Sequence, residues 1–280
     1  MSNPILLAVL SMVLTGTSDF LYRRARMRGV VPEFFLVIQA AFFNATNLAA
    51  IAISGGLQIS MITILFGFTC ALLGYTGVQL FLKSLGEGSA SINVTVFRLS
   101  FVVTAIAAFI FLRETITFGK MLAIGLSALS ILALSMTAQT GRTSRPMMAQ
   151  LILATILWGL FGFFYKVAIS MGATPTGILA AQGAVFITLA SVMAIRRGVF
   201  SDYRDVAIHA PVCGVLLSAS FLLLLESLKY GDVSVNFSIV QLSFVVTTIL
   251  AAVILREKIH TLNMLGLVAA FLAVISFAYV

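Results

Sequence analysis

A single arginine, Arg98, lies inside a run that is otherwise uncharged from Ala90 to Leu112. Because a helix rises about 1.5 Å per residue, a place about ten residues into this run lies near the middle of a membrane. Burying a guanidinium there costs at least about 2.5–3.5 kcal/mol, so such an arginine is usually paired or lines a wet cavity. One interpretation is an ion pair with Asp19 or Glu226, and the other is a planar fork that holds an anionic group of a bound molecule. Both hold if an internal carboxylate and that molecule use the same cation in different states.

Two carboxylates lie near the ends of other apolar runs. Asp19 is one turn from the charged end of its run, which begins at Arg23, and it could accept a coupling proton. It could also reach the membrane interface or pair with the nearby arginines, which is the simpler interpretation. Glu226 is equally close to the end of its run and is open to the same interpretations, a coupling group or a member of an ion pair.

Neutral polar and aromatic side chains deep in the apolar runs complete a candidate binding set for an amphipathic molecule. Hydrogen bonds between helices, worth about 0.6–2 kcal/mol each, explain many such polar residues without any ligand. Asn93 and Asn236 begin their apolar runs, so capping of a helix N-terminus is the simpler expectation for them. The full candidate set is Arg98, Gln241, Trp158, Tyr75, Gln79, Asn93 and Asn236.

The remaining reactive side chains form no catalytic constellation. The two histidines, His209 and His260, lie at the ends of apolar runs without partners at metal-ligand spacing. Cys70 and Cys213 lie inside apolar segments and are expected to be small packing residues. No nucleophile elbow, P-loop or nucleotide fingerprint is present. We therefore expect neither an enzyme nor an ATP-driven pump, and we expect no cofactor or metal.

The chain consists of two copies of one unit. The stretch Asn93 to Glu114, NVTVFRLSFVVTAIAAFIFLRE, recurs as Asn236 to Glu257, NFSIVQLSFVVTTILAAVILRE. The offset that pairs residue 93 with residue 236 also pairs Gly16 with Gly159 and, within the stretch, Arg98 with Gln241. We expect one copy over residues 1–139 and the other over 147–280, joined by the polar linker 140–146.

The composition is that of an integral membrane protein. Of 280 residues, 61% are hydrophobic and 9% are charged, and the mean hydropathy is +1.13, far outside the usage of soluble domains. The net charge of +8 is carried mostly by short loops, which indicates a topology signal and no nucleic-acid partner. The lipid bilayer is therefore the expected solvent of this chain.

Glycine, proline and charged residues divide the chain into ten apolar spans, five in each copy. An odd number of spans per copy forces the second copy to enter the membrane from the opposite side. We therefore expect an all-α membrane protein with ten transmembrane helices arranged as two inverted five-helix repeats. The spans are predicted near 4–22, 32–54, 59–82, 89–111, 119–138, 148–169, 175–195, 207–228, 233–255 and 261–280.

The loop charges predict an orientation. Loops after even-numbered spans carry Arg113, Lys120, Lys166 and Lys229. Loops after odd-numbered spans carry twelve of the 17 basic residues, and by the positive-inside rule they are cytoplasmic, which places both termini outside. These twelve are Arg23, Arg24, Arg26, Arg28, Lys83, Arg142, Arg145, Arg196, Arg197, Arg204, Arg256 and Lys258.

Two short motifs carry a resemblance to a known family. The second copy opens with Trp158-Gly159, and a Leu-Arg-Glu element closes the fourth span of both copies at Glu114 and Glu257. In ten spans and two copies, the chain resembles the EamA-like branch of the drug/metabolite transporter superfamily. The resemblance implies export of amino acids, drugs, nucleotide sugars or other metabolites through one architecture. It also implies cytoplasmic termini, contrary to the charge count, and the first copy departs from the motif at Thr15-Gly16.

The expected function is that of a secondary transporter, and most specifically an exporter of amino acids or related amphipathic solutes by alternating access. A nucleotide-sugar or lipid-linked phosphate carrier is the alternative, in which Arg98 would meet phosphate. A non-transporting membrane scaffold is a third candidate, although a scaffold needs no charge at mid-membrane. We expect a multi-pass protein of a bacterial inner membrane, acting as a monomer or homodimer on a small-molecule substrate.

Overall fold

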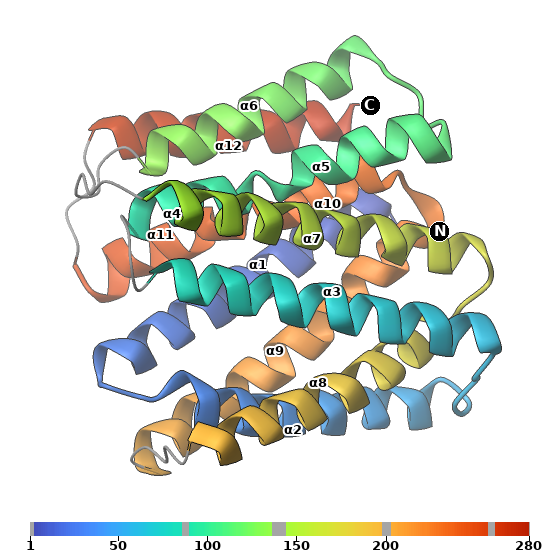
Figure 1. Cartoon of the computed structure of the whole chain (residues 1–280). Helices are drawn as coiled ribbons and strands as arrows, with labels where there is room; N and C mark the ends of the chain where they lie inside the picture. The colour runs from blue at the N-terminus through green and yellow to red at the C-terminus, as the bar shows by residue number, and fades with distance from the viewer. Residues whose placement is uncertain (1–2, 86–89, 136–143, 198–202, 257–260, 280) are drawn as a thin grey trace.

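The chain folds entirely into helices over the residues that the computed structural model describes, which are 3–85, 90–135, 144–197, 203–256 and 261–279 (Figure 1). Arg142, Glu257, Lys258, His260 and residues 140–143 of the linker lie outside these ranges. The helices are α1 (Pro4–Met27), α2 (Pro32–Ile53), α3 (Met61–Leu85), α4 (Ala90–Arg98), α5 (Ser100–Ala107), the π-helical η1 (Ala108–Leu112), α6 (Phe118–Ser135), α7 (Arg145–Ser170), α8 (Pro175–Arg197), α9 (Tyr203–Tyr230), α10 (Val233–Gln241), α11 (Ser243–Ile254) and α12 (Thr261–Ala278).

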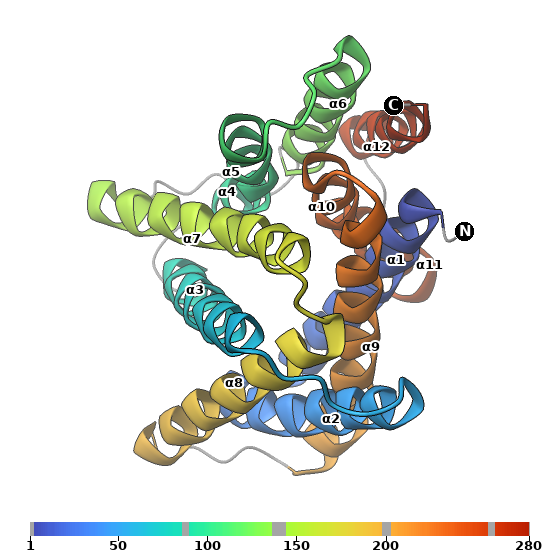
Figure 2. The same ribbon diagram turned by 90° about the vertical axis from the view of Figure 1, so that its right-hand side faces the viewer.

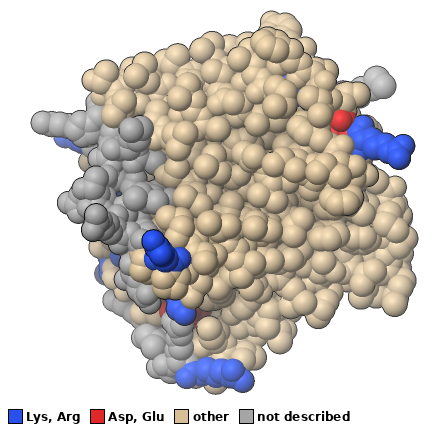
Figure 3. Space-filling view, turned by 45° about the horizontal axis from the view of Figure 1, so that its top comes forward, with Lys and Arg blue, Asp and Glu red and all other residues tan. Residues whose placement is uncertain are grey.

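The expectation of an all-α membrane protein is confirmed. Within the described ranges, nine helical segments are long and apolar enough to cross a membrane, and Phe118–Leu134 is a shorter apolar helix. Figure 3 shows charged side chains near two opposite edges of the molecule, with a broad uncharged surface between them. Such a surface suits the hydrocarbon core of a bilayer.

Helices of the first copy pack mainly against helices of the second. α1 lies against α9, α10 and α11, and the equivalent helix α7 lies against α3, α4 and α5. The pairs α2 with α8, α5 with α10 and α6 with α12 also join the two copies, as the two views show (Figure 2). The core is therefore built between the copies, and it buries large side chains such as Phe101, Phe161 and Tyr165.

The sequence pattern predicted continuous helices over 89–111 and 233–255, and in the structure both helices are broken. The breaks lie at Leu99 and Leu242, the first residues of the shared LSFVVT motif, whose ψ angles are 3° and 6°. The amide of Leu99 reaches both the Thr95 and the Val96 carbonyl at 3.2 Å, which is a tightened last turn. A new helix starts at once, so each break shifts the helix without leaving the membrane-spanning segment.

Close backbone contacts from the other copy accompany both breaks. A Cβ added to Gly159 of α7 would lie 2.6 Å from the carbonyl oxygen of Ser100, and one added to Gly16 of α1 would lie 2.3 Å from that of Ser243. The hydroxyl of Thr104 donates to the Gly159 carbonyl oxygen at 2.7 Å, beside the first of these contacts. α1 and α7 run unbroken through these glycines. The glycines allow neighbouring helices to touch at backbone distance.

Two prolines at equivalent places of the copies, Pro32 and Pro175, each occupy the first position of a helix, α2 and α8. There the missing N–H is not needed and the fixed φ suits the helix. Both prolines therefore mark helix starts.

Replacing Gly159 with Ala is expected to destabilise the protein by about 1–3 kcal/mol, because the new methyl group must displace the Ser100 carbonyl or Val103. The measurement is the midpoint of thermal unfolding in detergent. Gly125→Ala in α6 is the matched control, since a Cβ there meets no atom within 4 Å. Equal midpoints for the two variants would contradict the close-packing role.

Candidate functional site

Arg98 forms the centre of a small polar cluster at the two helix breaks. It is the last residue of α4, and its Nη2 donates to Oδ2 of Asp19 from α1 at 2.6 Å. Its Nη1 donates to Oγ of Ser243, the first residue of α11, at 2.8 Å. The cluster thus joins three segments, two from the first copy and one from the second, and it neutralises the guanidinium within the membrane-spanning part of the chain.

The cluster keeps part of its surface accessible on the inner side of α1. Asp19 exposes 35% of its side chain and Arg98 exposes 20%. The outward face of α1 is marked by the exposed residues Leu6, Leu10 and Val13. At about 100° per residue, Asp19 lies about 150° around the helix from that face. Its exposed surface therefore points toward the inside of the bundle and away from the outward face of α1.

The second copy has a neutral counterpart of this cluster. In the repeat register Gln241, Gly162 and Ser100 occupy the places of Arg98, Asp19 and Ser243. None of these three residues is charged. Gln241 is buried, and the Ser100 hydroxyl has no hydrogen-bond partner among the described residues. The ring of Phe237 fills the space at Gly162, 2.7 Å from where a Cβ would lie. One copy therefore presents a charged, accessible site and the other a dry, neutral one.

Aromatic rings form a wall that leads from Arg98 into the core. Phe97, the neighbour of Arg98, stacks on Phe81 of α3 with ring centroids 4.3 Å apart, and it lies 5.5 Å from Trp158. Trp158 in turn stacks on Phe161 at 4.9 Å, and Phe161 contacts Tyr165 at 4.4 Å. Phe161 and Tyr165 are fully buried. Trp158 thus packs against Phe97, the chain neighbour of Arg98, and its role in binding stays a prediction.

Other predicted site residues lie elsewhere. The Tyr75 hydroxyl donates to the Leu189 carbonyl at 3.4 Å, and its ring packs edge-on against Phe186 of α8. Gln79 is half-buried in α3, and its side chain makes no hydrogen bond to another described residue. Neither contacts the Arg98 cluster through a recorded bond.

The expectations for Asn93 and Asn236 need correction. α4 begins at Ala90 and α10 at Val233, so neither asparagine caps its helix. Each instead donates its amide to the carbonyl of a serine in the preceding helix, Asn93 to Ser84 at 2.6 Å and Asn236 to Ser227 at 3.0 Å. These equivalent bonds fix the start of one segment against the end of the one before it.

Glu226 is not the partner of Arg98. Its carboxylate pairs with Lys229 on the same helix at 2.7 Å, and about a third of each side chain is exposed. The pair is one turn apart on α9, near the end of that helix. Glu226 therefore belongs to a partly exposed ion pair, and Asp19 is the residue that neutralises Arg98.

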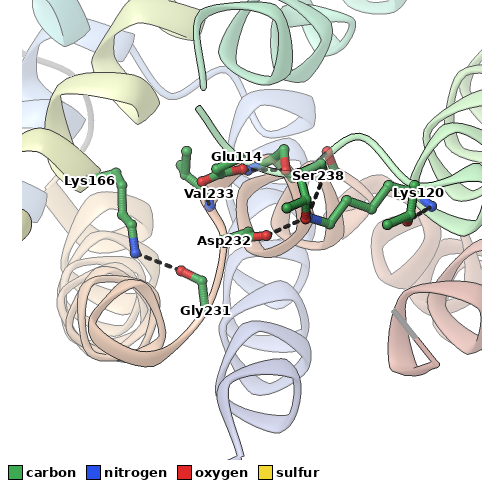
Figure 4. A network of polar contacts seen from close by, with 10 residues as sticks. Glu114, Lys120, Lys166, Gly231, Asp232, Val233 and Ser238 are labelled. Carbon is green, nitrogen blue, oxygen red and sulfur yellow. Dashed lines mark hydrogen bonds and ion pairs between the residues drawn. The ribbon is translucent and has the colours of Figure 1, made fainter. Parts of the chain in front are cut away.

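A second polar network, which sequence reasoning missed, lies at the end of the bundle where α1 begins (Figure 4). The carboxylate of Glu114 accepts the backbone N–H groups of Val233 at 2.7 Å and Ser234 at 3.2 Å, in the first turn of α10. The positive end of a helix dipole favours a carboxylate there. Lys120, which is 3% exposed, donates to the Asp232 carboxylate and to the Thr115 carbonyl at 2.9 Å. We call Glu114, Lys120 and Asp232 the end network.

Lys166 lies beside the end network and caps the end of α9. Its Nζ donates to the carbonyl oxygens of Leu228 at 2.6 Å and Gly231 at 2.8 Å, groups that a helix C-terminus leaves without partners. An open pocket of about 530 Å³ is lined here by Lys166, Glu114, Asp232 and others. The sequence held one signal for this region, since Glu114 and Asp232 are two of only nine acidic residues.

The shared Leu-Arg-Glu element has a common backbone geometry. Arg113 and Arg256 adopt left-handed φ angles of 54° and 55°, which are uncommon for residues other than glycine. In the first copy this turn ends η1 and brings Glu114 to α10 of the second copy. The motif is therefore a turn that connects the copies, and Glu257 of the other element lies outside the described residues.

Comparisons with known proteins agree with this architecture. The family model of the EamA-like transporter family matches residues 2–136 and 145–279. A search of curated proteins found no significant match. Among 29 matching chains of solved structures, one crystal structure superposes with a TM-score of 0.83 at 14% identity, covering 98% of this chain and 95% of that chain. At that identity the likeness concerns the fold.

Proposed function

The chain belongs to the EamA-like transporter family, and from this premise we propose that it is a secondary transporter of small metabolites, an exporter of amino acids or related amphipathic solutes. It is a multi-pass membrane protein, since its described helices are apolar and long enough to cross a bilayer. The observation that carries the proposal is the Arg98–Asp19–Ser243 cluster, a charged and partly accessible group among apolar helices. Groups of this kind mark solute or ion pathways in membranes.

We propose that the two copies, 1–139 and 147–280, form inverted halves of ten spans in all and exchange roles between inward and outward access. In Figure 1, α1 and α7 begin at opposite ends of the bundle, which supports this arrangement. Equivalent helices also make equivalent contacts, α1 with α9 and α7 with α3. In inverted repeats a second conformation arises when the halves exchange their local geometries.

Within this proposal the conformation at hand is closed at the end network and accessible at Asp19. Lys120 of the first copy and Asp232 of the second are bonded to each other, and Glu114 holds the start of α10. Opening that end separates α6 from α10 and must break these bonds. Phe161, Tyr165 and Trp158 form the apolar wall between the cluster and the core.

The test is a thermal-shift screen of the purified protein against amino acids, purines, organic cations and organic anions, followed by flux of each stabilising solute into proteoliposomes. A solute bound to the folded state raises the unfolding midpoint by mass action. We expect one class to stabilise the protein and to cross the membrane. If solutes of every class leave both the midpoint and the flux unchanged, a non-transporting scaffold is the better description.

A further inference from the structure

We propose that Asp19 and a carboxylate-bearing solute compete for Arg98, so that each solute anion binds together with one proton, taken up by Asp19. This inference rests on the transport function proposed above and adds to it the charge of the solute and the coupling ion. It follows from the contacts of Arg98, from the balance of charge at the cluster, and from the neutral counterpart in the second copy.

The contacts of Arg98 fit a carboxylate in the place that Asp19 occupies. Nη2 already binds one carboxylate oxygen at 2.6 Å, and the Ser243 hydroxyl lies 2.8 Å from Nη1 and 3.5 Å from the same oxygen. A solute carboxylate therefore meets the same guanidinium fork and a hydroxyl that can donate to its second oxygen. The exchange replaces one carboxylate with another and needs no new protein group.

Charge balance then requires a proton. In the structure the pair of Arg98 and Asp19 is neutral. An incoming anion that takes Arg98 leaves Asp19 as an unpaired and only partly exposed carboxylate among apolar helices, which is unfavourable. When Asp19 forms an O–H bond with a proton from water, one anion and one proton have entered and the net charge is again zero. Solute and proton therefore cross together without net movement of charge, so export must be driven by the solute's own outward gradient.

The other ionisable groups around Asp19 define the controls. α10 and α11 contribute Gln241 and Ser243, which do not titrate, and α4 contributes Arg98. α9 contributes Cys213, whose Sγ lies 3.5 Å from the Ser18 carbonyl, and one turn earlier the buried His209. Of these, His209 is the control for a proton taken up at a group other than Asp19. The ionisable groups on α1 itself within a turn are Tyr22 and Arg23.

The neutral counterpart explains why one proton suffices. Gly162 and Gln241 stand where the first copy has Asp19 and Arg98, so the second copy has neither the acid nor the cation. The helices that carry Arg98 and Asp19 are predominantly apolar, which favours a solute with an apolar body. Phenylacetate combines such a body with one carboxylate and is a suitable probe.

The experiment measures the apparent affinity of the full chain in detergent for phenylacetate at pH 5.5 and pH 8. Phenylacetamide, phenethylamine and phenylalanine serve as neutral, cationic and zwitterionic comparisons. With one proton bound per anion, the affinity for phenylacetate falls about tenfold per pH unit. Asp19→Asn is expected to bind at least as tightly as the wild type does at pH 5.5, and equally at both pH values. Asp19→Glu should keep the pH dependence, and Arg98→Gln should not bind phenylacetate.

Several outcomes overturn the inference. Phenylacetate binding that is absent or independent of pH in the wild type does so, and so does a pH dependence that is lost in His209→Gln. A zwitterion that bridges Arg98 and Asp19 needs no proton, and it reveals itself if phenylalanine binds well and Asp19→Asn weakens it. If phenylalanine or phenethylamine is transported while phenylacetate is not bound, the transport function stands and only the coupling is wrong.

Discussion

Arg98→Gln is expected to reduce solute flux into proteoliposomes by at least roughly 30-fold, while the protein remains folded. Removing one member of a hydrogen-bonded charge pair costs about 2–5 kcal/mol of binding, and the lower value already corresponds to roughly 30-fold. Gln fits the site, because Gln241 occupies the equivalent position beside the same kind of helix break. The measurement is initial flux of the solute identified by the thermal-shift screen.

A double variant separates the loss of function from a loss of stability. Arg98→Gln leaves Asp19 without its cation, which by itself destabilises the fold. Adding Asp19→Asn removes that unpaired charge, so the double variant should regain the unfolding midpoint and still lack flux. Flux that recovers together with the midpoint would show that Arg98 serves only the structure.

Asp232→Asn is expected to have the largest effect on stability, a loss of about 2–3 kcal/mol. Lys120 is 3% exposed, and without the carboxylate its ammonium stays buried and hydrogen-bonded to the two oxygens of Thr115. Breaking a buried pair costs about 3–5 kcal/mol. We expect less here because the Asp232 side chain is 40% exposed, so the local site is partly hydrated. Chemical unfolding in detergent measures the difference.

Glu226→Gln provides the matched control for this variant. The pair of Glu226 and Lys229 also joins an acid to a lysine, but 36% and 37% of the two side chains are exposed. Exposed pairs contribute about 0–1 kcal/mol, so little change is expected. If the two variants lose the same stability, burial of Lys120 is not what makes the end network important.

The repeat and the apolar spans could be predicted from the sequence, because neither depends on contacts between helices that are distant in the chain. The offset that pairs Gly16 with Gly159 needs only the chain itself, and so does the isolated charge of Arg98. The all-α membrane fold and the family followed from these patterns. The roles of the candidate site residues in binding stay predictions, as do the orientation in the membrane and the boundaries of the copies.

The details that depend on contacts between the copies could not be predicted. LSFVVT contains no glycine or proline that would announce a break at Leu99, and the break accompanies the approach of Gly159 to Ser100. The choice of Asp19 over Glu226 as the partner of Arg98 likewise depends on how α1 lies against α11. Glu114 was counted only as part of a motif, because its target, the start of α10, is more than a hundred residues away in sequence.

The partners of α1 have a consequence for biosynthesis. Its main neighbours α9, α10 and α11 all belong to the second copy, and the earliest of them begins at Tyr203. As the ribosome delivers the chain, the first helix enters the bilayer well before its main neighbours have been made. Assembly must therefore wait for the late segments, and until then Arg98 and Asp19 lack Ser243 beside them. A truncated nascent chain that ends before Tyr203 would leave α1 without its main neighbours, although α7 and α8 could already pack against α2 and α3.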